Sequence, residues 1–124
     1  MVCLAGGSGI TPFMSMIREI ASAGLDRRLT LLYGSRSEDD IIFADELRKL
    51  SSQHENIRCV PVISEPRAGC RERTGFLTAE LIRDVLGSVD GRTFYLCGPA
   101  EMYAFCLPQI EKLAIPPRWV RREM

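Results

Sequence analysis

Histidine, tryptophan and long apolar runs are scarce or absent in this sequence of 124 residues, which contains one histidine and one tryptophan. No apolar run approaches the ~20 residues that a transmembrane helix requires, so we expect no membrane span. No signal-peptide pattern precedes the first apolar segment. Neither sign of charge is in excess, because 16 basic residues balance 16 acidic ones. We therefore expect no basic surface of the kind that attracts nucleic acid.

The cysteines follow no disulfide or zinc-binding pattern. They are odd in number and scattered, and no Cys-x-x-Cys pair occurs among Cys3, Cys59, Cys70, Cys97 and Cys106. Such a pattern favours reduced thiols in a cytoplasmic protein. The single histidine, His54, lies in a polar stretch and no cluster of ligand residues surrounds it, so we expect a solvated side chain and no metal site.

Short apolar runs alternate with amphipathic stretches along the chain. With 46% hydrophobic and 26% charged residues, the sequence predicts one globular domain over residues 1–124. The expected strands are residues 1–5, 28–34, 57–63, 93–97 and, more exposed than the rest, 118–122. Alternation of this kind predicts a doubly wound α/β fold, a five-stranded parallel sheet with helices on both faces. Pro61 cannot donate to a strand ladder, which places its strand at a sheet edge.

The intervening stretches carry apolar residues at helical spacing. The first helix is expected over residues 13–21, with Thr11 as its N-cap, Pro12 in its first turn and Gly24 as its stop.

Three more helices are expected further along the chain. The second spans residues 43–50, and Thr78 caps the third, which carries residues 81–85. The fourth spans residues 102–113 and is kinked or broken at Pro108.

A glycine-rich turn over residues 6–12 joins the first strand to the first helix. In an open parallel sheet, ligands bind beyond the carboxyl ends of the strands. Glycine permits close approach of the backbone, and the free amides at a helix start favour phosphate. The turn therefore predicts a phosphate site, although a tight turn needed only for packing is the alternative. Pro12 stands where the third glycine of the Gly-x-Gly-x-x-Gly fingerprint would be, and no Gly-Lys-Ser/Thr follows.

The form Gly-x-Gly-x-x-Pro resembles the pyridine-nucleotide domain of the ferredoxin–NADP reductase superfamily. Three further stretches match that family in order, and together the matches cover nearly the whole chain. They are Tyr-Gly-Ser-Arg at 33–36, Asp-Glu-Leu at 45–47, and Cys-Gly-Pro at 97–99 with Met102.

The resemblance implies three groups of site residues. The pyrophosphate would lie on the turn, at Gly7, Ser8, Gly9, Thr11 and Pro12. The adenosine ribose would meet Ser35 and Arg36, unless Arg36 is an ordinary solvated charge. The nicotinamide would lie beside Cys97, Gly98, Pro99 and Met102.

Cys97 is the residue that the resemblance places nearest the chemistry. It would pack near the ring carbon that gives up hydride, and no histidine base suggests a covalent nucleophile. The alternative is a small buried apolar residue at a strand end.

The choice of cofactor depends on charges near the ribose. Arg36 suits the extra phosphate of NADPH, but the following Glu38, Asp39 and Asp40 oppose it. We therefore expect NADH in preference to NADPH.

The family carries its flavin, FAD or FMN, in a separate barrel with an Arg-x-Tyr-Ser/Thr motif, which this sequence lacks. The resemblance thus implies the C-terminal half of a larger flavoprotein reductase, an excised domain or a subunit, inactive without its flavin domain. The implied acceptor is an iron–sulfur centre or a similar electron carrier. A regulatory module that senses nucleotide is the alternative. A methyltransferase that uses S-adenosylmethionine is disfavoured. Such an enzyme needs an acidic residue at the end of the second strand to bind the ribose, and this sequence has Ser35 and Arg36 there.

Overall fold

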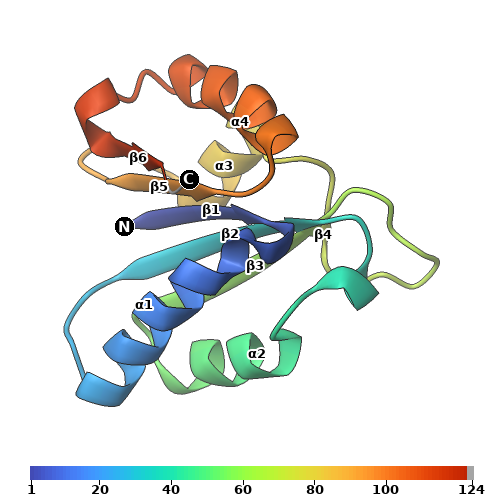
Figure 1. Cartoon of the computed structure of the whole chain (residues 1–124), viewed down its shortest axis with the longest axis vertical. Coiled ribbons are helices and arrows are strands. Elements are labelled where there is room, and N and C mark those ends of the chain that lie inside the picture. The colour runs from blue at the N-terminus through green and yellow to red at the C-terminus, as the bar shows by residue number, and fades with distance from the viewer. Residues whose placement is uncertain (123–124) are drawn as a thin grey trace.

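A parallel sheet forms the centre of the computed structural model, which describes residues 1–122 (Figure 1). Within these residues the sheet has six strands in the order β4-β3-β2-β1-β5-β6. The strands are β1 (Val2–Gly6), β2 (Leu29–Ser35), β3 (Ile57–Ile63), β4 (Arg73–Thr74), β5 (Phe94–Cys97) and β6 (Val120–Arg122). The helices are α1 (Thr11–Ala23), α2 (Ala44–Gln53), α3 (Ala79–Leu86) and α4 (Ala100–Lys112), with 3-10 turns at Gly7–Ile10, Glu38–Asp40 and Pro117–Trp119.

The prediction of five strands is wrong by one strand, the short β4. Its two residues are exposed and polar, so no apolar run marks them in the sequence. They become a strand because the preceding loop returns to the sheet, where β4 pairs with Val62 and Ile63 of β3. β3 is therefore not the edge strand that Pro61 predicted, because β4 lies outside it. Pro61 itself still lacks a partner on that side within residues 1–122, since β4 pairs only with the last two residues of β3. The five predicted strands are present and their pairings are all parallel.

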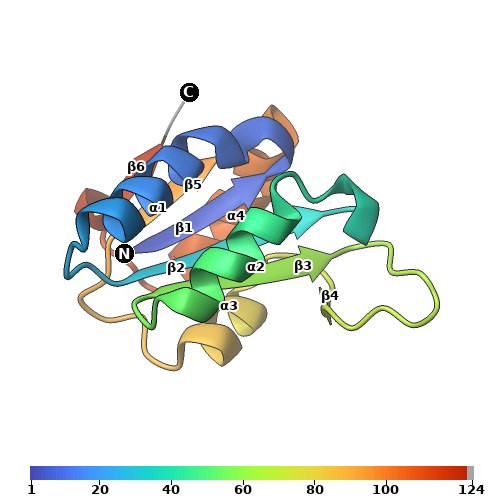
Figure 2. The same ribbon diagram turned by 90° about the horizontal axis from the view of Figure 1, so that it is seen from below.

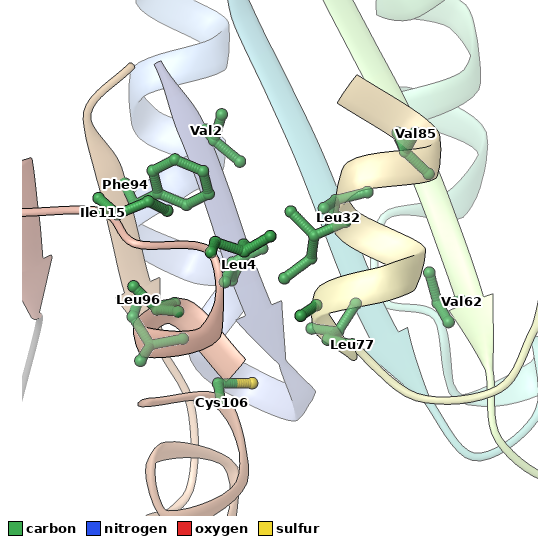
Figure 3. Packing of buried hydrophobic residues seen from close by; sticks show 14 residues of the cluster. Val2, Leu4, Leu32, Val62, Leu77, Val85, Phe94, Leu96, Cys106 and Ile115 are labelled. Carbon is green, nitrogen blue, oxygen red and sulfur yellow. The ribbon is translucent and has the colours of Figure 1, made fainter. Parts of the chain in front are cut away.

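Helices cover both faces of the sheet, α1 and α2 on one face and α3 and α4 on the other (Figures 1 and 2). Alternate residues of a strand point to opposite faces, which explains why β1 is apolar throughout. Cys3 packs with Phe13 of α1, whereas Leu4 packs with Phe94 of β5 and with the α3 and α4 side chains, as Figure 3 shows. The sheet is therefore held by two apolar clusters, one on each face.

The helix ends correct one prediction and confirm others. Thr11 is the first residue of α1 and not its N-cap, because the 3-10 turn Gly7–Ile10 leads directly into the helix. Its hydroxyl instead donates to the Ser8 carbonyl at 3.1 Å. Pro12 lies in the first turn, and Gly24 ends α1 in the left-handed conformation at φ +61°. The Thr78 hydroxyl accepts from the Leu81 amide and caps α3 as predicted.

The fourth helix is continuous across its proline. α4 runs from Ala100 to Lys112 with Pro108 inside it, so the predicted break does not occur. Phe105 of α4 is 39% exposed and lies at the edge of the crevice described next.

Candidate functional site

A crevice opens at the carboxyl ends of β1 and β2. It has a volume of about 450 Å³ and its lining is mostly apolar. From β1 the chain adds β2, β3 and β4 in turn on one side, and then β5 and β6 on the other side of β1. The strand order therefore reverses between β1 and β5. Gly6, the last residue of β1, and Pro99, which follows β5, both line the crevice. We call it the switch-point crevice, because ligands of open α/β sheets bind where the strand order reverses.

The glycine-rich turn borders this crevice, and its glycines are required for two different reasons. Gly7 is exposed and has φ +55°, a conformation that a side chain disfavours. Gly9 is buried, and a Cβ there would overlap the Cys97 carbonyl oxygen and lie 2.6 Å from the carbonyl carbon. Gly9 therefore permits contact between the turn and the end of β5, whereas Gly7 permits the bend itself.

The two roles predict different costs of substitution. Gly9→Ala is expected to lower the free energy of unfolding by about 2 kcal/mol, because the carbonyl that it meets is backbone and cannot move aside. Gly7→Ala meets no atom within 4 Å and should cost about 1 kcal/mol through its positive φ alone. Urea unfolding of both variants measures the difference. An equal or smaller loss for Gly9→Ala would contradict this packing role.

The segment after β5 forms one wall of the crevice. Cys97 is half-buried and pairs with Ala5 of β1, and Pro99 is the N-cap of α4. The thioether of Met102 rests on two glycines: a Cβ at Gly6 would lie 2.6 Å from its sulfur, and a Cβ at Gly98 would overlap it. The predicted turn and the predicted nicotinamide segment therefore lie in direct contact.

Ser35 is the last residue of β2, Arg36 follows it, and both line the same crevice. The Ser35 hydroxyl oxygen is buried and has no hydrogen-bond partner within residues 1–122. A buried hydroxyl without a partner costs free energy, so a polar ligand group that reached it would relieve that cost. Arg36 is exposed, and its charge is available at the mouth of the crevice.

The acidic turn beyond Arg36 is partly neutralised. The Asp39 carboxylate forms an ion pair with Arg67 at 2.6 Å, and the Asp40 carboxylate accepts from the Ser37 hydroxyl at 3.1 Å. The ion pair ties the turn to the loop after β3. The backbone amide of Glu65 in that loop also donates to the Arg36 carbonyl at 2.8 Å.

Two aromatic residues of the crevice were missed by sequence reasoning. The Phe76 and Phe105 rings lie 5.7 Å apart, centroid to centroid, and are tilted by 47°. They are 60% and 39% exposed, and two exposed rings in contact form an apolar surface of the kind that a ligand or partner can cover. They come from segments 29 positions apart in the sequence. The only local signal is the Gly75-Phe76 pair at the end of a charged loop.

The predicted site residues thus divide into two groups. Ser35, Arg36, Pro99 and Met102 line the crevice, whereas the glycine-rich turn and Cys97 lie beside it. Thr11 and Pro12 lie in the first turn of α1 and contribute no side-chain donor toward the crevice, since the Thr11 hydroxyl is bonded to Ser8 and proline has none. Which of these residues bind a ligand stays a prediction.

Trp119 lies away from this site. It directly precedes β6, whose first residue pairs with Phe94 at the start of β5. Trp119 therefore lies near the amino end of β5, whereas Cys97 lies at its carboxyl end. Among residues 1–122, no group of three or more His, Cys, Asp or Glu side chains could hold a metal ion, and the cysteines form no disulfide. In the same residues no helix has the length and apolar character to cross a bilayer.

Comparison with known proteins relates this site to a family. Residues 3–107 match the family model described as oxidoreductase NAD-binding domain. The chain is 35% identical over 117 residues to NADH-cytochrome b5 reductase 2 of Gallus gallus, covering 91% of this chain and 38% of that protein. It is 34% identical over 107 residues to the ferredoxin–NAD(P)(+) reductase component of the naphthalene 1,2-dioxygenase system of Pseudomonas putida, covering 86% of this chain and 32% of that protein.

A solved structure agrees with these matches. The cytochrome b5 reductase domain of Ulva prolifera nitrate reductase superposes with a TM-score of 0.89 at 28% identity, over 98% of this chain and 47% of that chain. The chain spans only 38% and 32% of the two curated relatives named above.

Proposed function

The chain belongs to the family of oxidoreductase NAD-binding domains, and from this membership we propose that it binds NAD(P)H in the switch-point crevice and presents the nicotinamide to a flavin, FAD or FMN, held by a separate domain or subunit. The buried Ser35 hydroxyl without a partner is the observation that carries the proposal. It lies at the carboxyl end of β2, where a ribose hydroxyl of a bound dinucleotide would satisfy it.

The crevice fits each part of a dinucleotide. The Phe76 and Phe105 rings offer an apolar surface for adenine near Ser35 and Arg36, which suit the ribose. Gly7 and Ser8 are exposed in the 3-10 turn that leads into α1, and their backbone amides would suit the pyrophosphate. Cys97 and Gly98 then lie beyond the turn, where the nicotinamide would follow.

When bound, NAD(P)H supplies a hydride ion that a flavin accepts. The residues of this chain orient the nicotinamide and exclude water from one of its faces. We propose that the small side chain of Cys97 packs against the ring, with the Met102 thioether fixing the neighbouring backbone. The chain would then form part of a flavoprotein reductase that delivers electrons to an iron–sulfur or similar acceptor. The names of the two curated relatives above, reductases of cytochrome b5 and of ferredoxin, support this proposal.

We further propose a preference for NADH. Glu38, Asp39 and Asp40 disfavour a 2′-phosphate beside Arg36, although the ion pair of Asp39 with Arg67 offsets part of their charge. One named relative is an NADH-dependent reductase, which agrees with this preference. A cytoplasmic location is proposed on the same footing, supported by cysteines that form no disulfide.

Titration of the purified chain with NADH and NADPH tests the proposal, with NADH expected to bind more tightly. Ser35→Ala is expected to weaken NADH binding by roughly three- to tenfold, as for the loss of one hydrogen bond. The same change should not lower the free energy of unfolding, because it removes an unsatisfied buried group. Weaker binding with undiminished stability distinguishes a ligand contact from a structural hydroxyl.

Two outcomes would overturn parts of this proposal. Failure of the wild-type chain to bind either nucleotide would remove it altogether. Binding without any reduction of acceptor when the chain is joined to a flavin-bearing reductase domain would favour a nucleotide sensor instead.

A further inference from the structure

The buried hydroxyl of Tyr33 connects two segments that border the switch-point crevice. Tyr33 lies on β2, facing α1 and α2, and its ring is 1% exposed. The hydroxyl donates to the Gly7 carbonyl at 2.7 Å and accepts from the Ile42 amide at 3.4 Å. One side chain therefore holds the glycine-rich turn and the segment that leads into α2.

The bond to Gly7 determines the direction of the next amide. In a trans peptide the carbonyl and the following N–H point in opposite directions. Because the Gly7 carbonyl points to Tyr33, the Ser8 N–H points away from the α1 and α2 face, on the side where Ser8 is exposed. This peptide lies in the 3-10 turn Gly7–Ile10, and Gly7 has no Cβ whose packing could hold it, so the Tyr33 hydroxyl supplies a side-chain restraint in addition to the turn. A rotated peptide would present its carbonyl oxygen to an anion in place of the amide.

We propose that the Tyr33 hydroxyl is a positioning group, which fixes the Gly7–Ser8 peptide so that the Ser8 amide donates to the pyrophosphate of a bound dinucleotide; this rests on the proposed function. Burial raises the pKa of Tyr33 above its usual value, so the hydroxyl keeps its proton and donates throughout the neutral range. The contact with Ile42 anchors the same hydroxyl from the other side and holds it in place.

Tyr33→Phe tests the proposal, because it removes the hydroxyl and keeps the ring in the core. Two probes are titrated, ADP-ribose, which carries the pyrophosphate, and adenosine, which does not. We expect the affinity for ADP-ribose to fall about fivefold, because the Ser8 amide would then donate to the pyrophosphate only part of the time. The affinity for adenosine should be unchanged. Tyr95→Phe is the matched control, since Tyr95 packs against the same apolar cluster from β5. It should change neither affinity.

The outcomes are distinct for this inference and for the proposed function. Equal losses for ADP-ribose and adenosine would show that Tyr33 only supports the crevice as a whole, and an unchanged affinity for ADP-ribose would show that the turn needs no such restraint. Either result overturns the inference and leaves nucleotide binding intact. If the wild-type chain binds ADP-ribose no better than adenosine, the phosphate-binding turn itself is absent and the proposed function fails with it.

Discussion

Phe76→Ala is expected to weaken NADH binding by roughly ten- to hundredfold, the largest effect on affinity of any single substitution in the crevice. Phe76 is 60% exposed, so its ring contributes little to the stability of the fold. Most of its surface is instead accessible to a ligand. Stacking of a base on an aromatic ring contributes about 1–3 kcal/mol, which corresponds to this range. Phe105 lies against Phe76, so Phe105→Ala should act in the same direction by removing the support of the first ring.

Fluorescence titration with NADH measures the effect, and thermal unfolding confirms that the variant is folded. Phe43→Ala is the matched control, because Phe43 is also exposed, at 38%, but contacts Arg18 and does not line the crevice. Nicotinamide mononucleotide separates the two halves of the ligand, since it lacks adenine. An equal loss for that probe, or an unchanged affinity for NADH, would show that adenine does not lie on these rings.

The elements of the fold that could be predicted are those with a local signal. Continuous apolar runs marked four of the strands, the exposed strand near residues 118–122 being the exception, and Gly24 and Thr78 marked helix boundaries, because each acts on its own neighbours. β4 has no such signal: Arg73 and Thr74 are strand residues only because the returning loop sets them beside β3. Thr11 was misjudged for a related reason, since the 3-10 turn before it already occupies the place of a cap.

The candidate site divides along the same line. The resemblance predicted Ser35, Arg36, Pro99 and Met102 as site residues, and the topology brings all four to one crevice. Their binding of a ligand stays a prediction. Phe76 and Phe105 share no motif, and they come from segments far apart in the sequence. The bond from Tyr33 to Gly7 joins residues 26 positions apart, and nothing in either neighbourhood indicates it.

Alkaline pH is expected to destabilise the chain strongly through Cys3. This residue lies on the central strand β1 with no exposed surface, and burial raises the pKa of its thiol from 9.0 to about 12. Between these values the unfolded chain loses the proton and the folded chain keeps it. Stability is therefore full below pH 9 and falls as pH rises, by up to about 1.4 kcal/mol per pH unit. At pH 11 the loss from this one thiol reaches about 3 kcal/mol, a large part of the ordinary stability of a domain.

Other buried thiols act in the same direction, because burial raises the pKa of Cys59 and of Cys106 to about 11. Urea unfolding at pH 8, 9.5 and 11 separates the contribution of Cys3 when wild type is compared with Cys3→Ala. The lost sulfur should lower stability by a constant amount at every pH, whereas the absent titration should make the decline between pH 9 and 11 less steep. Parallel curves for the two proteins would show that the Cys3 thiol ionises as readily in the folded chain as in the unfolded one, and that β1 is more accessible to water than its packing against both neighbouring strands implies.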